Sequence, residues 1–120
     1  MSDTLQIKIT LEDAVLTATL TDSPTTRDFV SLLPLTVTLE DYAGTEKINY
    51  LPQKLSTEGA TPGSDPAIGD ITYYAPWGNL AIFHKDFGYA NGLIILGKID
   101  GDIEALRKPG SVEATLELLK

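Results

Sequence analysis

Few residues in this chain are able to carry out acid–base or nucleophilic chemistry. His84 is the only histidine and cysteine is absent, so any mechanism that uses histidine must run through this one side chain. No serine stands in a nucleophile-elbow motif, and no acidic residue is marked as an orienting partner. Two interpretations of His84 stay open: a residue on the rim of a binding cavity, or a partly exposed histidine at a strand end. A hydrolase acting through His84 is the weakest functional hypothesis.

Three acidic residues have the spacing that opens a calcium-binding loop. Asp100, Asp102 and Glu104 alternate along the chain, but Ala105 stands where the loop needs glycine and Ser111 where it needs a bidentate glutamate. The pattern favours a turn followed by a helix cap. A single histidine excludes a metal site built on histidines, and the nearby glycines form no phosphate-binding fingerprint. We predict neither a metal nor a cofactor.

The aromatic residues are concentrated in one short segment. Six of the nine Phe, Trp and Tyr residues are Tyr73, Tyr74, Trp77, Phe83, Phe87 and Tyr89. Trp77 falls in an expected turn, and Phe87 and Tyr89 flank a glycine in an expected loop. Large amphipathic rings at such positions suit the capture of an apolar or proline-containing ligand beside a barrel mouth, although the same rings could plug the barrel end. The predicted ligand-binding residues are Tyr74, Trp77, Phe83, His84, Phe87 and Tyr89.

Strand patterns surround this segment. Apolar and polar residues alternate over residues 5–11, 35–40 and 112–118, which is typical of half-buried strands. Residues 71–75 and 80–83, joined by a turn at 76–79, carry apolar side chains on both faces, as does the strand expected over 93–99. Strands of this kind must be covered on both sides, which favours a closed or partly closed barrel with helices packed outside. We therefore expect Ile95 to lie in the core.

Short helices and one long loop complete the chain. Ser23 and Pro24 form a helix start, and a second short helix is expected over residues 102–106. The segment from Leu55 to Gly69 is rich in Gly, Pro, Ser and Thr and is expected to be a long irregular loop, either structural or functional. We find no repeat or linker, so residues 1–120 are interpreted as one domain.

Composition narrows the possible partners. The chain has 9 basic and 17 acidic residues, a formal net charge of −8. Phosphate binding needs clustered Lys and Arg, so nucleic acid and anionic membrane surfaces are not expected partners. No signal peptide is visible after Met1, and the apolar runs are far shorter than the ~20 residues that span a bilayer. We expect a cytoplasmic protein of undetermined oligomeric state.

Three motifs resemble those of the bacterial cyclophilin-like protein family. They are GDITYYAPWGNLAIF (69–83), KDFGY (85–89) and GLIILGKI (92–99), and the resemblance extends over nearly the whole chain. It implies a mainly β protein: a cyclophilin-like closed barrel of about eight strands with short flanking helices. Members of this family are mostly uncharacterised, so the resemblance implies a fold more than an activity.

The likeness to the prolyl-isomerase cyclophilins is weaker. Residues 96–99 (LGKI) are similar to one of their strands, but their catalytic arginine has no match, because Arg27 and Arg107 both fall on expected helices. Lys54 is a possible substitute cation, although a point charge replaces a planar guanidinium poorly. The leading hypothesis is a non-enzymatic module that binds a small molecule or an extended peptide. The alternative is a divergent peptidyl-prolyl cis-trans isomerase acting on proline-containing peptides.

Overall fold

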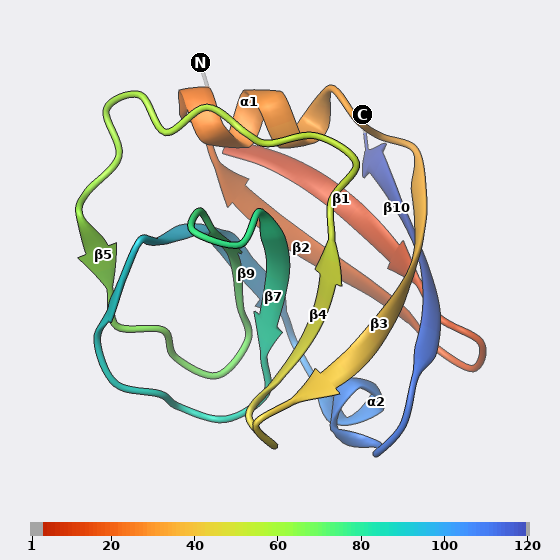
Figure 1. The fold of residues 1–120 in the computed structure, drawn as a ribbon. Coiled ribbons are helices and arrows are strands. Elements are labelled where there is room, and N and C mark those ends of the chain that lie inside the picture. Colours follow the sequence, from red (N-terminus) through yellow and green to blue (C-terminus); the bar gives the residue numbers. More distant parts are fainter. Residues whose placement is uncertain (1–3, 120) are drawn as a thin grey trace.

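The computed structural model describes residues 4–119 as a closed antiparallel barrel (Figure 1). Eight strands form the barrel in the order β1-β10-β3-β4-β7-β6-β9-β2, which confirms the predicted fold class. The elements are β1 (Thr4–Thr10), β2 (Val15–Thr21), α1 (Pro24–Val30), β3 (Leu35–Tyr42), β4 (Glu46–Tyr50), β5 (Gly63–Ser64), β6 (Asp70–Tyr74), β7 (Asn79–Phe83), β8 (Ala90–Asn91), β9 (Leu93–Asp100), α2 (Glu104–Arg107) and β10 (Val112–Leu119).

The two short helices lie at opposite ends of the barrel (Figure 1). Ser23 caps α1, its side chain accepting a hydrogen bond from the backbone N–H of Thr26 at 3.1 Å, and Pro24 begins the helix as the sequence predicts. Phe29 then points into the barrel core and is completely buried. Neither helix in the described part of the chain is long and apolar enough to cross a membrane.

The long loop after β4 contains a short strand that the sequence did not indicate. Strand β5 pairs with β8, with Gly63 opposite Asn91 and Ser64 opposite Ala90. This two-stranded sheet lies outside the barrel (Figure 1). It ties the loop before β6 to the loop between β7 and β9, so two segments far apart in sequence are held together beside the barrel wall.

The wall formed by β4, β7, β6 and β9 buries apolar side chains on both faces. On β7, Leu80 and Ile82 belong to the barrel core, whereas Ala81 and Phe83 belong to a second buried cluster with Ile48. The register places Ile48 opposite Ala81, so these side chains share the outer face of the wall. The prediction of strands covered on both sides is therefore correct for β7, and the outer cover forms the floor of a pocket.

The expectation that Ile95 lies in the core is wrong. A β-bulge interrupts the β6–β9 ladder: Ile71 pairs with Gly97 and Thr72 with Ile95, so Leu96 has no residue opposite it. Leu96 points into the core and is fully buried, whereas Ile95 lies on the outer face with 39% of its surface exposed. An uninterrupted apolar sequence does not show where such a bulge falls, nor where the outer cover ends.

Candidate ligand-binding pocket

A pocket of about 200 Å³ lies on the outer face of the barrel wall. Its floor is the outer cluster of buried residues, Ile48, Ala81, Phe83 and Leu93, with Tyr74 and Ala90 packed against it. The pocket is lined by Tyr42, Ala43, Glu46, Ile48, Tyr74, Trp77, Asn79, Phe83, Phe87, Ala90 and Leu93. These residues come from β3, β4, β6, β7, β8, β9 and the segments between them, so the site lies on the wall and not at the barrel mouth that the sequence suggested.

Three aromatic rings form one side of the pocket. The ring of Trp77 meets the ring of Tyr74 edge to face, with centroids 5.3 Å apart, and meets the ring of Tyr42 in the same way at 5.6 Å. The tight turn between β6 and β7 holds Trp77 there, because Gly78 adopts a positive φ of 70° and its N–H donates to the carbonyl of Tyr74 at 2.9 Å. Tyr42 and Trp77 remain 42% and 47% exposed.

A fourth and a fifth ring line another part of the pocket. Phe83 is buried on the floor, and its ring centroid is 6.0 Å from that of Phe87. The loop after β7 carries Phe87 over the floor, and the backbone N–H of Phe87 donates to the carbonyl of Pro66 at 3.3 Å. Phe87 is about half exposed, so it covers the apolar floor without closing the pocket.

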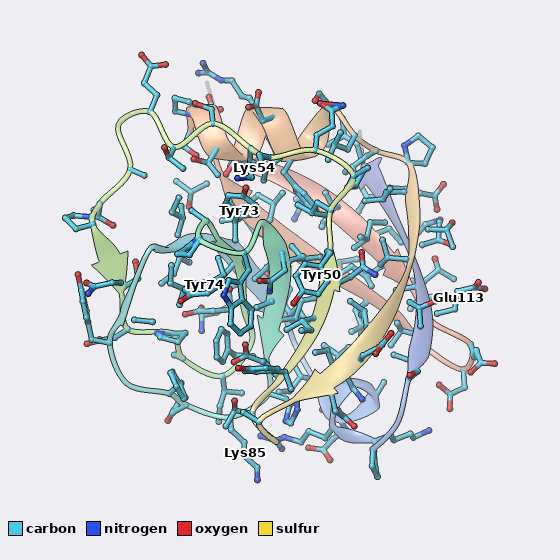
Figure 2. The ribbon with its side chains drawn as sticks, viewed as in Figure 1. Tyr50, Lys54, Tyr73, Tyr74, Lys85 and Glu113 are labelled. Carbon is cyan, nitrogen blue, oxygen red and sulfur yellow. The ribbon has the colours of Figure 1, made fainter. Side chains whose placement is uncertain are left out.

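Four of the six predicted site residues lie together. Tyr74, Trp77, Phe83 and Phe87 all line the pocket. Tyr89 does not: it is mostly exposed, and its ring lies against the backbone of Gly63 in β5. In Figure 2, Tyr74 lies over the wall near β7, whereas Tyr73 points toward the α1 end. The hydroxyl of Tyr73 is buried and accepts a hydrogen bond from the N–H of Leu55.

His84 also lies outside the pocket lining. It follows Phe83 directly, and because side chains alternate along a strand it turns toward the opposite side of the wall. Its ring is buried, with both ring nitrogens lacking a hydrogen-bond partner among the described residues. Burial, and next the charge of Lys47, lower the pKa of His84 below its ordinary value. A neutral, enclosed imidazole of this kind does not present a base to a ligand in the pocket.

The sequence interpretation missed seven of the eleven residues that line the pocket, and three of these seven carry polar groups: Tyr42, Glu46 and Asn79. Tyr42 ends β3, Glu46 begins β4 and Asn79 begins β7. The β4–β7 ladder places Glu46 opposite Phe83, and this pairing brings a carboxyl group to the pocket wall. Burial raises the pKa of Glu46, and a hydrogen bond from the hydroxyl of Thr45 opposes that shift. Only the strand register reveals this carboxyl, because residues 41–54 carry a weak strand pattern.

The cations considered for isomerase chemistry lie elsewhere. Arg27 on α1 is paired with Asp22 at 2.8 Å, and Arg107 on α2 donates to the carbonyl of His84 and to Glu104. Lys54 is exposed, and its alkyl chain lies beside the turn at Gly78; Figure 2 shows it toward the α1 end. None of these side chains lines the pocket. Within residues 4–119, no group of three or more potential ligand residues is arranged to hold a metal ion.

A closed eight-stranded antiparallel barrel with short helices at its ends is consistent with a cyclophilin-like fold. The model of the Cyclophilin-like family matches residues 9–117, and the chain belongs to this family. The solution structure of a hypothetical protein from Archaeoglobus fulgidus is similar in fold, with a TM-score of 0.67 over 98% of this chain and 96% of that one, at 16% sequence identity. No curated protein matches the chain.

Proposed function

We propose that the protein is a non-enzymatic binding module that holds a small molecule or an extended peptide in the aromatic pocket on the barrel wall. The observation that supports this is the combination of a buried apolar floor with three half-exposed rings above it, those of Tyr42, Trp77 and Phe87. When a ligand covers aromatic rings that are exposed around an apolar hollow, apolar surface is removed from water, and this favours binding.

The size of the pocket limits what enters it. A volume of about 200 Å³ is below the roughly 300–1,000 Å³ that is typical for drug-sized ligands. The pocket therefore suits a small metabolite, or one side chain of a peptide whose backbone runs across the exposed rings. We also propose that the protein is cytoplasmic, as expected from the sequence, and this location fits either kind of ligand. A bacterial origin, which the family resemblance implies, is part of the same proposal.

The divergent prolyl isomerase is the alternative, and the pocket offers it little support. Isomerisation requires a donor aimed at the prolyl nitrogen, which weakens the amide resonance. The pocket lining contains no Arg, Lys or His. We expect turnover of a short Ala-Pro peptide in a protease-coupled assay to be no faster than the uncatalysed reaction. Turnover comparable to that of a true cyclophilin would reverse the ranking, and Lys54→Ala would then be the first variant to examine.

The binding proposal is tested by a screen of metabolites and proline-containing peptides, read by thermal shift. A ligand that binds only the native state raises the melting temperature. Trp77 is the only tryptophan and lines the pocket, so its fluorescence reports occupancy directly. We expect Trp77→Ala to abolish the thermal shift given by a hit.

Tyr50→Ala is the matched control for that variant. Tyr50 is an exposed aromatic residue on the outer face of β4, outside the pocket lining (Figure 2). Ligand binding should survive its truncation. A hit that binds equally well to the wild type and to Trp77→Ala would place its site elsewhere and contradict the proposal.

A further inference from the structure

The polar atoms of the pocket restrict the chemistry of its ligand, and this inference rests on the binding function proposed above. Glu46 contributes a carboxyl group to the wall. Its neighbour Thr45 donates a hydrogen bond to Oε2 at 3.3 Å, and no ion pair involves Glu46 among residues 4–119. The carboxylate therefore faces the pocket partly removed from water and without a counter-ion from the described chain.

A second acceptor lies in the same pocket. Asn79 is 2% exposed, and its amide nitrogen donates to the carbonyl of Leu80 at 3.1 Å. Its carbonyl oxygen Oδ1 is buried and has no partner among the described residues. A buried acceptor without a donor is costly and uncommon in folded proteins. Asn79 pairs with Tyr50, four residues along β7 from the Phe83–Glu46 pair, so this oxygen lies at the other end of the ladder from the carboxylate.

The aromatic walls have the same electrostatic preference. The faces of Trp, Tyr and Phe rings carry partial negative charge and attract cations. Five such residues line the pocket beside Glu46, and no Lys, Arg or His lies among the lining residues. The carboxylate and the ring faces therefore both favour positive charge, and none of the lining residues is basic.

We propose that the pocket binds a protonated amine on a short alkyl chain, with the ammonium group at the Glu46 carboxylate and the alkyl chain against the aromatic rings. The volume of about 200 Å³ accommodates about six groups of the size of a water molecule, at roughly 30 Å³ each, which is enough for a butylammonium ion or a lysine side chain. Two sources share this chemistry: a free alkylamine, and a lysine of an extended peptide.

The test compares charged probes with neutral probes of the same shape. n-Butylamine is paired with n-butanol, and N-acetyl-lysinamide with N-acetyl-norleucinamide. Affinities are measured near neutral pH by Trp77 fluorescence and by calorimetry. We expect each ammonium probe to bind at least about tenfold more tightly than its neutral partner, because charge-assisted hydrogen bonds are the stronger ones. Stronger binding of butylamine indicates a free amine as the ligand, and stronger binding of lysinamide indicates a peptide lysine.

Glu46→Gln then removes the charge and keeps the shape of the side chain. The tenfold preference for ammonium should disappear in this variant, while binding of the neutral probes stays the same. Glu113→Gln is the matched control, because it makes the same change in net charge on β10, away from the pocket (Figure 2). It should bind all four probes as the wild type does.

The outcomes separate this inference from the proposed function. Neutral probes that bind as tightly as charged ones to the wild type overturn the inference and leave the binding module standing. If all four probes fail to bind but the screen yields a ligand whose binding requires Trp77, the inference is again overturned and the binding module stands. Failure of the probes and of the whole screen overturns both. The wild-type comparison decides even if Glu46→Gln does not fold.

Discussion

Glu46 and Lys47 are neighbours in β4, carry opposite charges and point to opposite faces of the barrel wall. Lys47 is completely buried, with its Nζ 2.7 Å from the carboxylate of Asp41. It also donates to the carbonyls of Lys108 and Gly110, which follow α2. Glu46 faces outward into the pocket. Because the lysine is turned inward and already paired, it leaves the adjacent carboxylate without a counter-ion.

Because Asp41 is paired with the buried Lys47, we expect that removing Asp41 lowers the free energy of unfolding substantially. In Asp41→Ala, Lys47 would be a buried cation with only carbonyl acceptors, and removing one partner of a buried pair costs ~3–5 kcal/mol. Asp41 is partly exposed and the carbonyl bonds remain, so we expect the lower end, about 3 kcal/mol, in the free energy of unfolding measured by urea denaturation. Asp22→Ala breaks the exposed pair with Arg27 and should leave the free energy of unfolding almost unchanged, because solvent screens such a pair. Similar losses in both variants would contradict the structural role of Asp41.

The rings of the pocket should differ in their contribution to stability. Phe83 is buried on the floor, so Phe83→Ala is expected to cost about 3–5 kcal/mol. Trp77 is 47% exposed and buries only about half of its surface, so Trp77→Ala should cost about 2 kcal/mol. Urea denaturation of the two variants, followed by circular dichroism, measures the difference. Equal losses would mean that Trp77 serves as core packing, and the binding site would then be withdrawn.

Much of the barrel could be predicted from local patterns. The turn at residues 76–79 is recognisable because Pro, Gly and Asn suit its backbone, and Gly78 does adopt positive φ. Gly97 stands where β2 and β9 approach closely: a Cβ there would lie 2.7 Å from the Cα of Leu20. Local backbone constraints of this kind are visible in short sequence motifs, and the resemblance to the cyclophilin-like family rests on motifs that contain Gly78 and Gly97.

The site could be predicted only in part, because strand register decides which side chains share a face. Phe83 and His84 are consecutive, yet Phe83 lies on the pocket floor and His84 lies outside the lining. Glu46 enters the pocket through its pairing with Phe83, from a strand 37 positions earlier in the chain. Ile95 is displaced to the surface by the bulge at Leu96. Each of these outcomes depends on contacts between distant strands, which one-dimensional periodicity does not contain.

His84 should make the protein less stable in mild acid. Burial lowers the pKa of His84 below 6.5 in the folded state, so the unfolded chain binds the proton more readily as the pH falls through about 6.5. The charges of Lys47, Lys85 and Arg107 act in the same direction, and Asp41 opposes them. Stability due to neutral His84 is therefore present above pH 6.5 and lost below it.

Replacing this side chain tests the assignment. His84→Leu has no group that titrates in this range, so the decrease in melting temperature between about pH 7.5 and pH 5 should be smaller in the variant than in the wild type. His84 is the only histidine, and the comparison isolates its contribution. Identical pH profiles would show that His84 is accessible to solvent and titrates normally.

Glu46 should have the opposite linkage, because burial raises its pKa above 4.5 in the folded state. The folded state then binds the proton more readily than the unfolded chain, so stability decreases as the pH rises from about 4.5 through the raised pKa. The other titratable side chains in the pocket lining are Tyr42 from β3 and Tyr74 from β6, and neither supplies a positive charge to offset this cost.

Glu46→Gln should therefore melt at a higher temperature than the wild type near pH 7.5, with the difference vanishing near pH 4, where the wild-type carboxyl is also neutral. Glu113→Gln, which removes an exposed carboxylate, should show no such pH-dependent gain. Addition of n-butylamine at pH 7.5 should then raise the melting temperature of the wild type more than that of Glu46→Gln, because tighter binding stabilises the native state more. A wild type that is more stable than Glu46→Gln at pH 7.5 without ligand would show that Glu46 is already neutralised within the fold, and no cation would be required.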